Sequence, residues 1–391
     1  MGHHDVTDIR RNVFLDTGCA IKLLVDAFSK LPNLRSVGIR DYDGNGRTRD
    51  GDRAKWRSYG WSLIERNDRT RQSYASPDAM LLTLLFALGE ASIRPTNLEA
   101  FLRRKRMPDE SFDLSCSPTD VTPVLSGLRT LLLSLEDDPE HYPGFDEHNH
   151  LKNFLQHTPL LEHLRLNFTN MYVHPFTVTS SQEFLRWFGA PSGVASASGP
   201  TPISLDHLTT LDLGMLTVTP KILLQVVSKC AKLKALSLWK VNLNPNSQGP
   251  NDNADCLWSR YLPEIGKALQ APEDVSSFMI GFAGEAHSGR PSADYADVKF
   301  AKRISVDRNG EKKFEEPEGK ISYRKRVGSN VHDWLEDLSK RTFREVMESS
   351  DDSDDDEDHE DDDGEGDDGD EGDDGEEDEI EVDEDEVIVL S

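Results

Sequence analysis

The sequence has few cysteines and no long apolar run, and each shortage excludes a class of protein. Its four cysteines are widely spaced among 391 residues and form no Cys-x-x-Cys pair, which argues against a cysteine zinc site and a disulfide framework. The longest apolar run, 79–88, is interrupted by Thr83 and is too short to cross a bilayer. The first eleven residues hold no apolar signal core. We therefore expect reduced thiols, no membrane association, and a location in the nucleus or cytoplasm.

Catalytic sequence motifs are also missing. The chain has no nucleophile elbow, no phosphate-binding glycine loop and no His-Glu-x-x-His pair. These motifs place a nucleophile, a phosphate or a zinc ion where chemistry needs it. Without them, we expect a protein that is not an enzyme and that uses no cofactor.

Basic residues are absent from the end of the chain. Residues 349–391 contain no Lys or Arg but hold 27 of the 72 Asp and Glu residues. The first 348 residues therefore carry 45 acids against 44 bases, so the net charge of −28 belongs almost wholly to the last segment. Because such dense charge opposes collapse, we expect a disordered acidic tail at 349–391.

The sequence does contain a recurring leucine pattern, Leu-x-x-Leu-x-Leu. Residues 208–213 carry it once and residues 233–238 carry it again, with apolar residues at helical spacing between them at 222–227. Such a strand–turn–helix unit buries its apolar face only by stacking on its neighbours. The whole chain holds seven copies, which start at Leu34, Leu98, Leu128, Leu161, Leu208, Leu233 and Val275. The copy that starts at Leu98 is weak, because Arg103 occupies its third apolar position.

The spacing of these copies is irregular. Successive starts lie 64, 30, 33, 47, 25 and 42 residues apart, whereas a regular leucine-rich repeat recurs every 20–29 residues or so. The sequence therefore predicts an α/β fold, an irregular leucine-rich-repeat solenoid with right-handed strand–helix repeats and a parallel sheet. An ordinary α/β domain with parallel strands is the alternative. Helices are expected at 13–30, 76–88 (with Met80 to Leu88 as its buried body), 151–155, 181–188 and 257–269.

The character of the sequence changes near residue 290. Residues 299–344 hold thirteen bases against eight acids, and Asn309-Gly310 predicts a hairpin turn. A helix expected at 330–347 would cap the last repeat. We therefore predict three parts, which are a leucine-rich-repeat body at 1–290, a basic C-terminal region with a capping helix at 291–348, and the acidic tail at 349–391.

The body resembles leucine-rich-repeat proteins of filamentous fungi, a family often attached to an F-box. The resemblance rests on residues 31–61, 160–170 and 208–216 and covers roughly residues 10–285. It implies a scaffold that recognises a protein substrate on its concave strand surface, with a Skp-type adaptor of a cullin ubiquitin ligase as a second partner. No F-box-like segment opening on Leu-Pro is seen before Leu34. A stand-alone repeat body and a body whose F-box precedes Met1 both stay open.

The acidic tail points to a second class of function. A repeat body with a long acidic tail is similar to the acidic leucine-rich nuclear phosphoproteins, which shield histones. Its 27 acids can replace phosphate contacts and release counterions from a basic partner. This alternative is a nuclear protein that binds histones or other basic proteins, and it argues against nucleic acid as a partner. The tail can also simply aid solubility.

One loop has the spacing of a calcium site. Asp41, Asp43 and Asn45 supply oxygen ligands at loop positions one, three and five, Gly46 takes position six, and Asp52 closes the loop at position twelve. The closing Asp reaches less far than the usual Glu, and two arginines lie within the loop. A polar loop that uses glycine for tight turns is the alternative.

Three other clusters carry weaker signals. His141, Glu147, His148 and His150 offer metal ligands but lack the i, i+4 spacing of a helical site. The basic runs 103–106 and 324–326 suit a nuclear import signal, a nucleic-acid patch or a solvated face. None of these patterns selects one function by itself.

The chain ends in an apolar tetrapeptide preceded by acids. Val387, Ile388, Val389 and Leu390 favour an extended strand, and acidic residues 384–386 come before them. This pattern looks like the motif that adds a strand to the sheet edge of the small ubiquitin-like modifier. We therefore predict a binding motif for that modifier here. An incidental apolar end, or one that docks on an edge strand, is the alternative.

Overall fold

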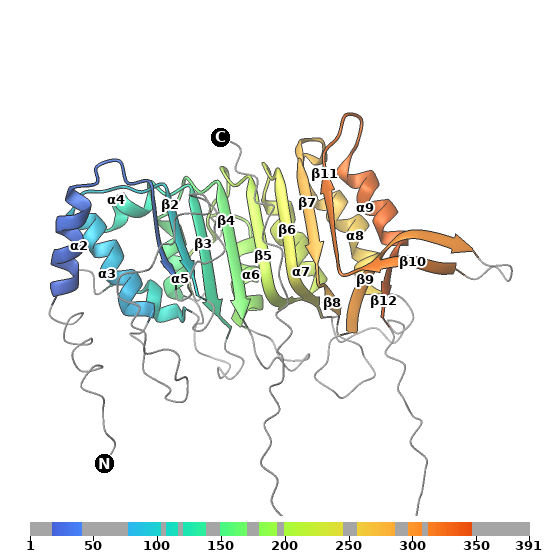
Figure 1. Ribbon diagram of the computed structural model, residues 1–391, viewed down its shortest axis with the longest axis horizontal. Coiled ribbons are helices and arrows are strands. Elements are labelled where there is room, and N and C mark those ends of the chain that lie inside the picture. Colours follow the sequence, from blue (N-terminus) through green and yellow to red (C-terminus); the bar gives the residue numbers. More distant parts are fainter. Residues whose placement is uncertain are drawn as a thin grey trace, which may run out of the picture. The chain divides into compact units, whose positions relative to one another are not determined.

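The computed structural model describes residues 18–40, 77–102, 107–115, 120–137, 149–169, 180–193, 199–244, 256–285, 296–306 and 312–345. The chain divides into two compact units, residues 1–346 and 347–391, and the described residues all belong to the first. Their fold is α/β, with a mostly parallel sheet of twelve strands and helices along one side (Figure 1). The predicted α/β class and parallel sheet are confirmed. No helix in these ranges is both long and apolar enough to span a bilayer.

Seven strands run parallel in chain order. They are β1 (Ser36–Arg40), β2 (Asn97–Phe101), β3 (Thr130–Glu136), β4 (His163–Thr169), β5 (Thr210–Val218), β6 (Ala235–Leu243) and β7 (Ser277–Gly281). The helices around them are α2 (Cys19–Ser29), α3 (Pro77–Glu90), α4 (Thr122–Leu125), α5 (Asn149–Gln156), α6 (Ser180–Gly189), α7 (Pro220–Lys229) and α8 (Leu257–Ala268). Two single 3₁₀ turns, η3 (Asp109–Phe112) and η4 (Pro272–Asp274), complete this part.

The last segments extend the sheet, mostly through antiparallel pairs. They are β8 (Gly284–Glu285), β9 (Ala296–Val306), β10 (Lys312–Glu318), β11 (Lys320–Arg324), α9 (Val331–Lys340) and β12 (Thr342–Arg344). Strand β9 pairs with β8, β10 and β12, and β11 pairs with β7. Strands β9 and β10 thus form the predicted hairpin, although its expected turn at 309–310 lies outside the described residues.

The helix expected at 330–347 is shorter than the prediction. Helix α9 ends at Lys340, and Arg341 leaves the helical conformation with φ −100° and ψ 2°. The chain then extends as β12, where Phe343 stacks on Phe314 with ring centroids 4.3 Å apart. Pairing with β9 therefore prevails over the helical spacing of the apolar residues. Helix α9 packs against α8.

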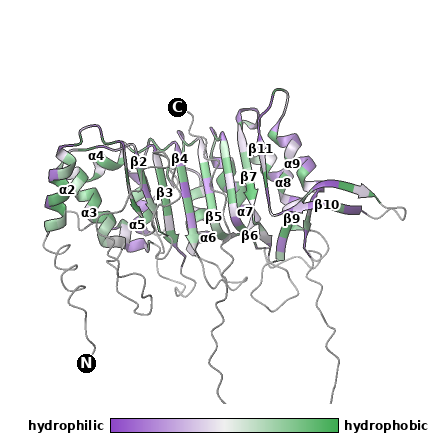
Figure 2. Ribbon diagram, viewed as in Figure 1, coloured by the Kyte–Doolittle hydropathy of each residue, from purple (hydrophilic) through white to green (hydrophobic). Residues whose placement is uncertain are grey.

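The register of the parallel strands places equivalent apolar residues side by side. One ladder comprises Val37, Leu98, Leu131, Leu164, Leu211, Leu236 and Phe278, and the second comprises Ile39, Ala100, Leu133, Leu166, Leu213, Leu238 and Ile280. All fourteen side chains are buried under the helices. Figure 2 shows the resulting alternation of apolar and polar residues along the strands.

A backbone ladder fixes the same register where the strands begin. Six carbonyl groups each accept the N–H groups of two successive residues of the next unit, at 2.7–3.2 Å. They belong to Arg35, Thr96, Arg129, Glu162, Thr209 and Lys234. Because each unit repeats the same pair of hydrogen bonds, the strands cannot slip past one another without breaking several bonds at once.

The register corrects the position of the second repeat. Leu98 aligns with Leu131 and Ala100 with Leu133, so Leu98 is the second apolar residue of its copy, not the first. The buried Pro95 occupies the first position. Arg103 is therefore not a member of the pattern, and the copy is weak because it uses a proline and an alanine. The strand itself was predicted correctly.

The predicted buried body of α3 also needs a correction. Met80 is 42% exposed, whereas Leu81, Leu85 and Leu88 are fully buried. The helix turns its 81–85–88 face to the core, and Met80 precedes that face by one residue, or about 100° of helical rotation.

Carboxylates from distant segments bind the starts of three helices. Asp109 accepts two backbone N–H groups at the start of α5, at 2.9 and 3.0 Å. The buried Asp137 accepts hydrogen bonds from Ser180 and Ser181 at the start of α6. Glu285 does the same for α8. These acids satisfy N–H groups that have no partner within a helix, and their charge is favourable at a helix N-terminus.

Glu285 joins three elements and is completely buried. Its Oε2 accepts from the N–H of Leu257 at 2.6 Å and lies 3.3 Å from the sulfur of Cys256. Its Oε1 accepts from Nε of Arg344 at 2.6 Å. The carboxylate therefore ties β8 to the start of α8 and to β12.

We expect Glu285→Ala to lower the free energy of unfolding by about 3 kcal/mol, because it leaves the Arg344 guanidinium, which is only 16% exposed, without its carboxylate. Urea unfolding followed by circular dichroism measures this. Glu264→Ala is the control, since it removes an exposed ion pair with Lys267 on the same helix α8 and is expected to cost less than about 1 kcal/mol. Equal losses in the two variants would show that Glu285 does not hold this end together.

Candidate functional site

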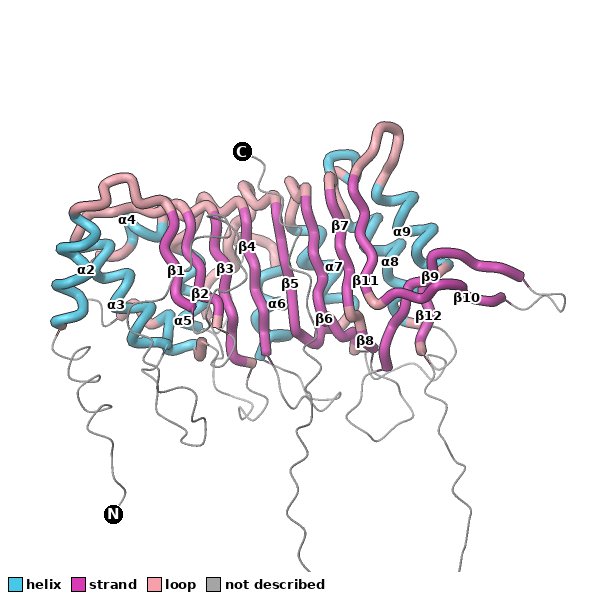
Figure 3. Tube along the Cα trace, viewed as in Figure 1, coloured by secondary structure: helices cyan, strands magenta, loops and turns pink. Residues whose placement is uncertain are grey.

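The side of the sheet opposite the helices forms an accessible surface, called here the open face (Figure 3). Its side chains alternate with the two buried ladders, and most are partly or fully exposed. Among the described residues of β4, β5, β6, β7 and β11, the open face comprises three rows, each made of residues that lie side by side in the strand register. They are His163, Thr210, Ala235, Ser277 and Arg324; Arg165, Asp212, Ser237, Met279 and Ser322; and Asn167, Gly214, Trp239, Gly281 and Lys320.

A charged cluster lies at β4 and β5. Arg165 is directly opposite Asp212 in the strand register and donates from Nε to its Oδ2 at 3.0 Å. His163 brings Nε2 to 2.9 Å from the same oxygen. Burial of Asp212 opposes its ionisation, but the hydrogen bonds and positive charge of His163 and Arg165 prevail and lower the pKa of Asp212 below 3.8. The cluster presents fixed charges of both signs.

An aromatic cluster lies beside it, on β6, on β11 and directly after the end of β7. Trp239 meets the ring of Phe282 edge to face, with centroids 4.8 Å apart, and Phe282 is 53% exposed. Lys320 holds its Nζ 5.6 Å from the centre of the Trp239 ring. A side chain at Gly281 would begin only 2.7 Å from the indole, so the glycine gives Trp239 room to lie across the neighbouring strand.

A repeated backbone bend accompanies this cluster. Met215, Lys240 and Phe282 follow the last open-face residue of β5, β6 and β7, and all three have left-handed φ angles of 55°, 51° and 50°. In β5 and β6, Gly214 pairs with Trp239 and pairing resumes one residue beyond the bend. Left-handed backbone is costly for residues with a side chain. The bends of β5 and β6 lie directly side by side, so neither strand carries an extra residue. Phe282, at the third bend, contacts Trp239.

The open face therefore combines kinds of groups that protein interfaces commonly use. Partly or fully exposed aromatic residues and cations are typical interface anchors, and charged clusters are typical orienting groups. The groups are spread over five strands and do not converge on one enclosed point.

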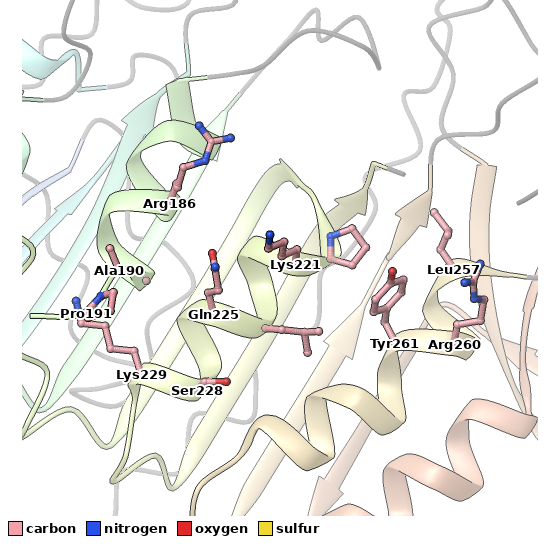
Figure 4. A pocket seen from close by; sticks show the side chains of 13 residues that line it. Arg186, Ala190, Pro191, Lys221, Gln225, Ser228, Lys229, Leu257, Arg260 and Tyr261 are labelled. Atoms are coloured by element: carbon pink, nitrogen blue, oxygen red, sulfur yellow. The ribbon is translucent and has the colours of Figure 1, made fainter. Parts of the chain in front are cut away.

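A cavity of about 740 Å³ lies on the helix side, among α6, α7 and α8 (Figure 4). Its cationic lining residues are Arg186, Lys221, Lys229 and Arg260, and Leu224 and Tyr261 are among its apolar ones. Burial lowers the pKa of Lys229 to about 8, and its Nζ donates to the carbonyl of Phe188 at 2.8 Å. Arg186 is paired with Glu183. The cavity is thus lined by basic side chains, and two of them, Lys229 and Arg186, already bind other groups of the protein.

Most of the predicted site residues lie outside the described residues. This holds for the calcium candidates Asp41, Asp43, Asn45 and Asp52, for the C-terminal motif Val387–Leu390, and for the basic run 103–106. Of the histidine cluster, His150 is described, and its Nδ1 lies 3.5 Å from Asp113. In the described ranges no group of three or more His, Cys, Asp or Glu residues is arranged to hold a metal ion.

Sequence reasoning missed the aromatic cluster, although part of its signal was present. Trp239 follows Leu238 directly, at the position that Gly214 and Gly281 occupy in the neighbouring copies. Aligning the copies would have shown one large aromatic residue between two glycines. The contribution of Lys320 could not be found in this way, because 38 residues of sequence separate β11 from its partner strand β7.

We expect Asp212→Asn to lower the free energy of unfolding by about 2 kcal/mol at pH 7, because hydrogen bonds to an ionised carboxylate are lost. The folded-state pKa lies below 3.8, so this stabilisation is present above that pH and fades as the pH falls below it. Urea unfolding of both proteins between pH 3 and pH 7 measures it. A deficit that stays constant over the whole range would contradict the ionised cluster.

We expect Gly281→Ala to lower the free energy of unfolding by about 1–3 kcal/mol, because the new methyl group overlaps the Trp239 ring. Gly319→Ala is the matched control, since its nearest neighbours are atoms of Phe282 at an ordinary 3.5 Å. If both variants are equally stable, Trp239 does not lie on Gly281.

Comparison with known proteins does not assign the chain to a family. No protein-family model matches the chain, and no curated protein matches it.

Proposed function

We propose that the protein is a non-enzymatic leucine-rich-repeat scaffold that binds a protein partner on its open face. The observation that carries the proposal is the register of seven parallel strands, which buries two apolar ladders on one side and leaves the other accessible. Stacked strand–helix units in one register also support an irregular repeat solenoid. Solenoids of this kind commonly use the strand face for recognition.

The partner is expected to contact the aromatic cluster first. Trp, Tyr and Arg dominate the binding energy of protein interfaces, and Trp239 and Phe282 provide such an anchor within reach of Lys320. The charged cluster of His163, Arg165 and Asp212 would then set the orientation, since mismatched charges are costly at an interface.

The leading biological version of this proposal is substrate recognition for a Skp–cullin ubiquitin ligase. Its support is the resemblance of residues 31–61, 160–170 and 208–216 to fungal F-box-associated repeat proteins. In that version the open face holds the substrate, and a Skp-type adaptor is a second partner.

The alternative is a nuclear protein that binds histones or other basic proteins through its acidic residues. The 27 acids of residues 349–391 favour it, because a polyanion attracts basic partners whatever the repeat body does. The two functions use different parts of the chain and can be separated by variants.

We expect the double variant Arg165→Glu, Trp239→Ser to lose specific partners in a quantitative affinity purification, because it reverses a charge and removes the anchor on the open face. Lys221→Glu, on the helix side, is the control and should keep them. Recovery of a Skp-type adaptor and a cullin would support the ligase version.

Equal recovery of every partner by the open-face variant and the control would contradict docking on the open face. Histones that are retained by both variants but lost from a 1–348 truncation, with strong salt dependence, would instead support the acidic-tail alternative.

A further inference from the structure

Strand β11 lies at an edge of the sheet. It pairs with β7, and within the described ranges no strand pairs with its other side (Figure 3). An unpaired strand edge presents a row of N–H and C=O groups that can accept another strand. β11 is also the strand that closes the open face at its C-terminal end.

The hydrogen-bond pattern shows which residues of β11 point outward. The N–H of Phe282 donates to the carbonyl of Gly319 at 2.7 Å, and the N–H of Lys325 donates to the carbonyl of Ser276 at 2.8 Å. In an antiparallel pair, hydrogen-bonded residues alternate with residues whose backbone groups face the other way. Residues 319, 321, 323 and 325 therefore face β7, and the backbone of Lys320 and Ser322 is directed to the outer edge.

The two faces of β11 differ in chemistry. Lys320, Ser322 and Arg324 are exposed on the open face, directly opposite Gly281, Met279 and Ser277 in the register. The intervening residues Ile321 and Tyr323 lie on the helix side. There Tyr323 is buried, and its ring lies 5.5 Å from that of Trp334 on α9.

We propose that the outer edge of β11 binds an extended peptide that alternates acidic and aliphatic residues. The peptide would add to the sheet as a further strand, with Ser322 exchanging backbone hydrogen bonds with it. Its acidic side chains would lie beside Lys320 and Arg324, and its aliphatic side chains would continue the apolar layer of Ile321 and Tyr323. This site does not depend on the docking of a partner on the open face.

The charges of β11 select the occupant. Lys and Arg on an edge strand normally prevent pairing with neutral or basic strands, because their charges lie beside the incoming chain. An acidic strand converts the same residues into attractive cross-strand pairs. Affinity would come from the backbone, and selectivity would come from charge and alternation.

The test uses the full-length protein and a fluorescent synthetic peptide, Glu-Val-Glu-Ile-Glu-Val, in an anisotropy titration. We expect saturable binding that weakens as salt is added, and no binding of the matched neutral peptide Gln-Val-Gln-Ile-Gln-Val. If the acidic peptide shows no saturable binding, or if the two peptides bind equally, the proposal is wrong.

Ser322→Pro separates edge pairing from simple charge attraction. Proline removes the outward N–H but no N–H that faces β7, and it leaves Lys320 and Arg324 unchanged. We expect binding at least about tenfold weaker than wild type, whereas Ser322→Ala, which keeps the N–H, should stay within about twofold. Equal binding by the proline and alanine variants would overturn the proposal.

A peptide variant covers the case in which proline disturbs the fold. The acidic peptide with N-methyl groups on its three glutamates cannot donate hydrogen bonds to β11, although its charge is unchanged. We expect wild-type protein to bind it at least about tenfold more weakly than the unmodified peptide. Undiminished binding would show that charge alone holds the peptide and would refute strand addition.

Discussion

The register of the parallel strands is the constraint on which the rest of the structure depends. Each strand presents apolar residues two positions apart, and they lie beside the same pair on both neighbours. A slip of one residue would turn every buried leucine to the open face. The bifurcated backbone bonds at the strand starts hold the alignment against such a slip. Because the register is fixed, the open face is fixed as well, and the aromatic and charged clusters are its products.

The connections between strands vary widely in length, so they cannot position the helices by themselves. Buried carboxylates position the helices where the connections between strands are long. Asp137, which follows β3, binds the start of α6, and Glu285, on β8, binds the start of α8. Each acid belongs to a segment that is distant in sequence from the helix it caps, so it ties units together as well as satisfying N–H groups. Long insertions are tolerated because these ties do not depend on loop length.

The strands and helices were largely predictable from periodicity, because the same apolar spacing recurs in every unit. The second copy was misplaced by three residues because Pro95 and Ala100 stand where leucines stand elsewhere. The end of α9 was misjudged because Phe343 fits a helical spacing as well as a strand. Local sequence could not indicate that pairing with β9 would prevail there.

The candidate site was less accessible to sequence reasoning than the fold. Left-handed backbone at Met215, Lys240 and Phe282 has no signal in residue type, since glycine or asparagine would be expected at such positions. The bend is a property of three adjacent strands together. The contact between Lys320 and the Trp239 ring forms because β11, which comes late in the sequence, pairs with β7. The open face therefore follows from the repeat pattern, whereas its distinctive groups follow from tertiary contacts.

One face of the sheet is buried under the helices and the other is accessible, and hydroxyl-radical footprinting with mass spectrometry tests this arrangement most directly. The chain offers matched pairs of reactive residues, with Trp239 and Met279 on the open face and Trp258 and Met107 at most 1% exposed in the core. The account predicts rapid oxidation of Trp239 and Met279 in the folded protein and protection of Trp258 and Met107. Protection of all four residues would show that the open face is covered and would contradict the account.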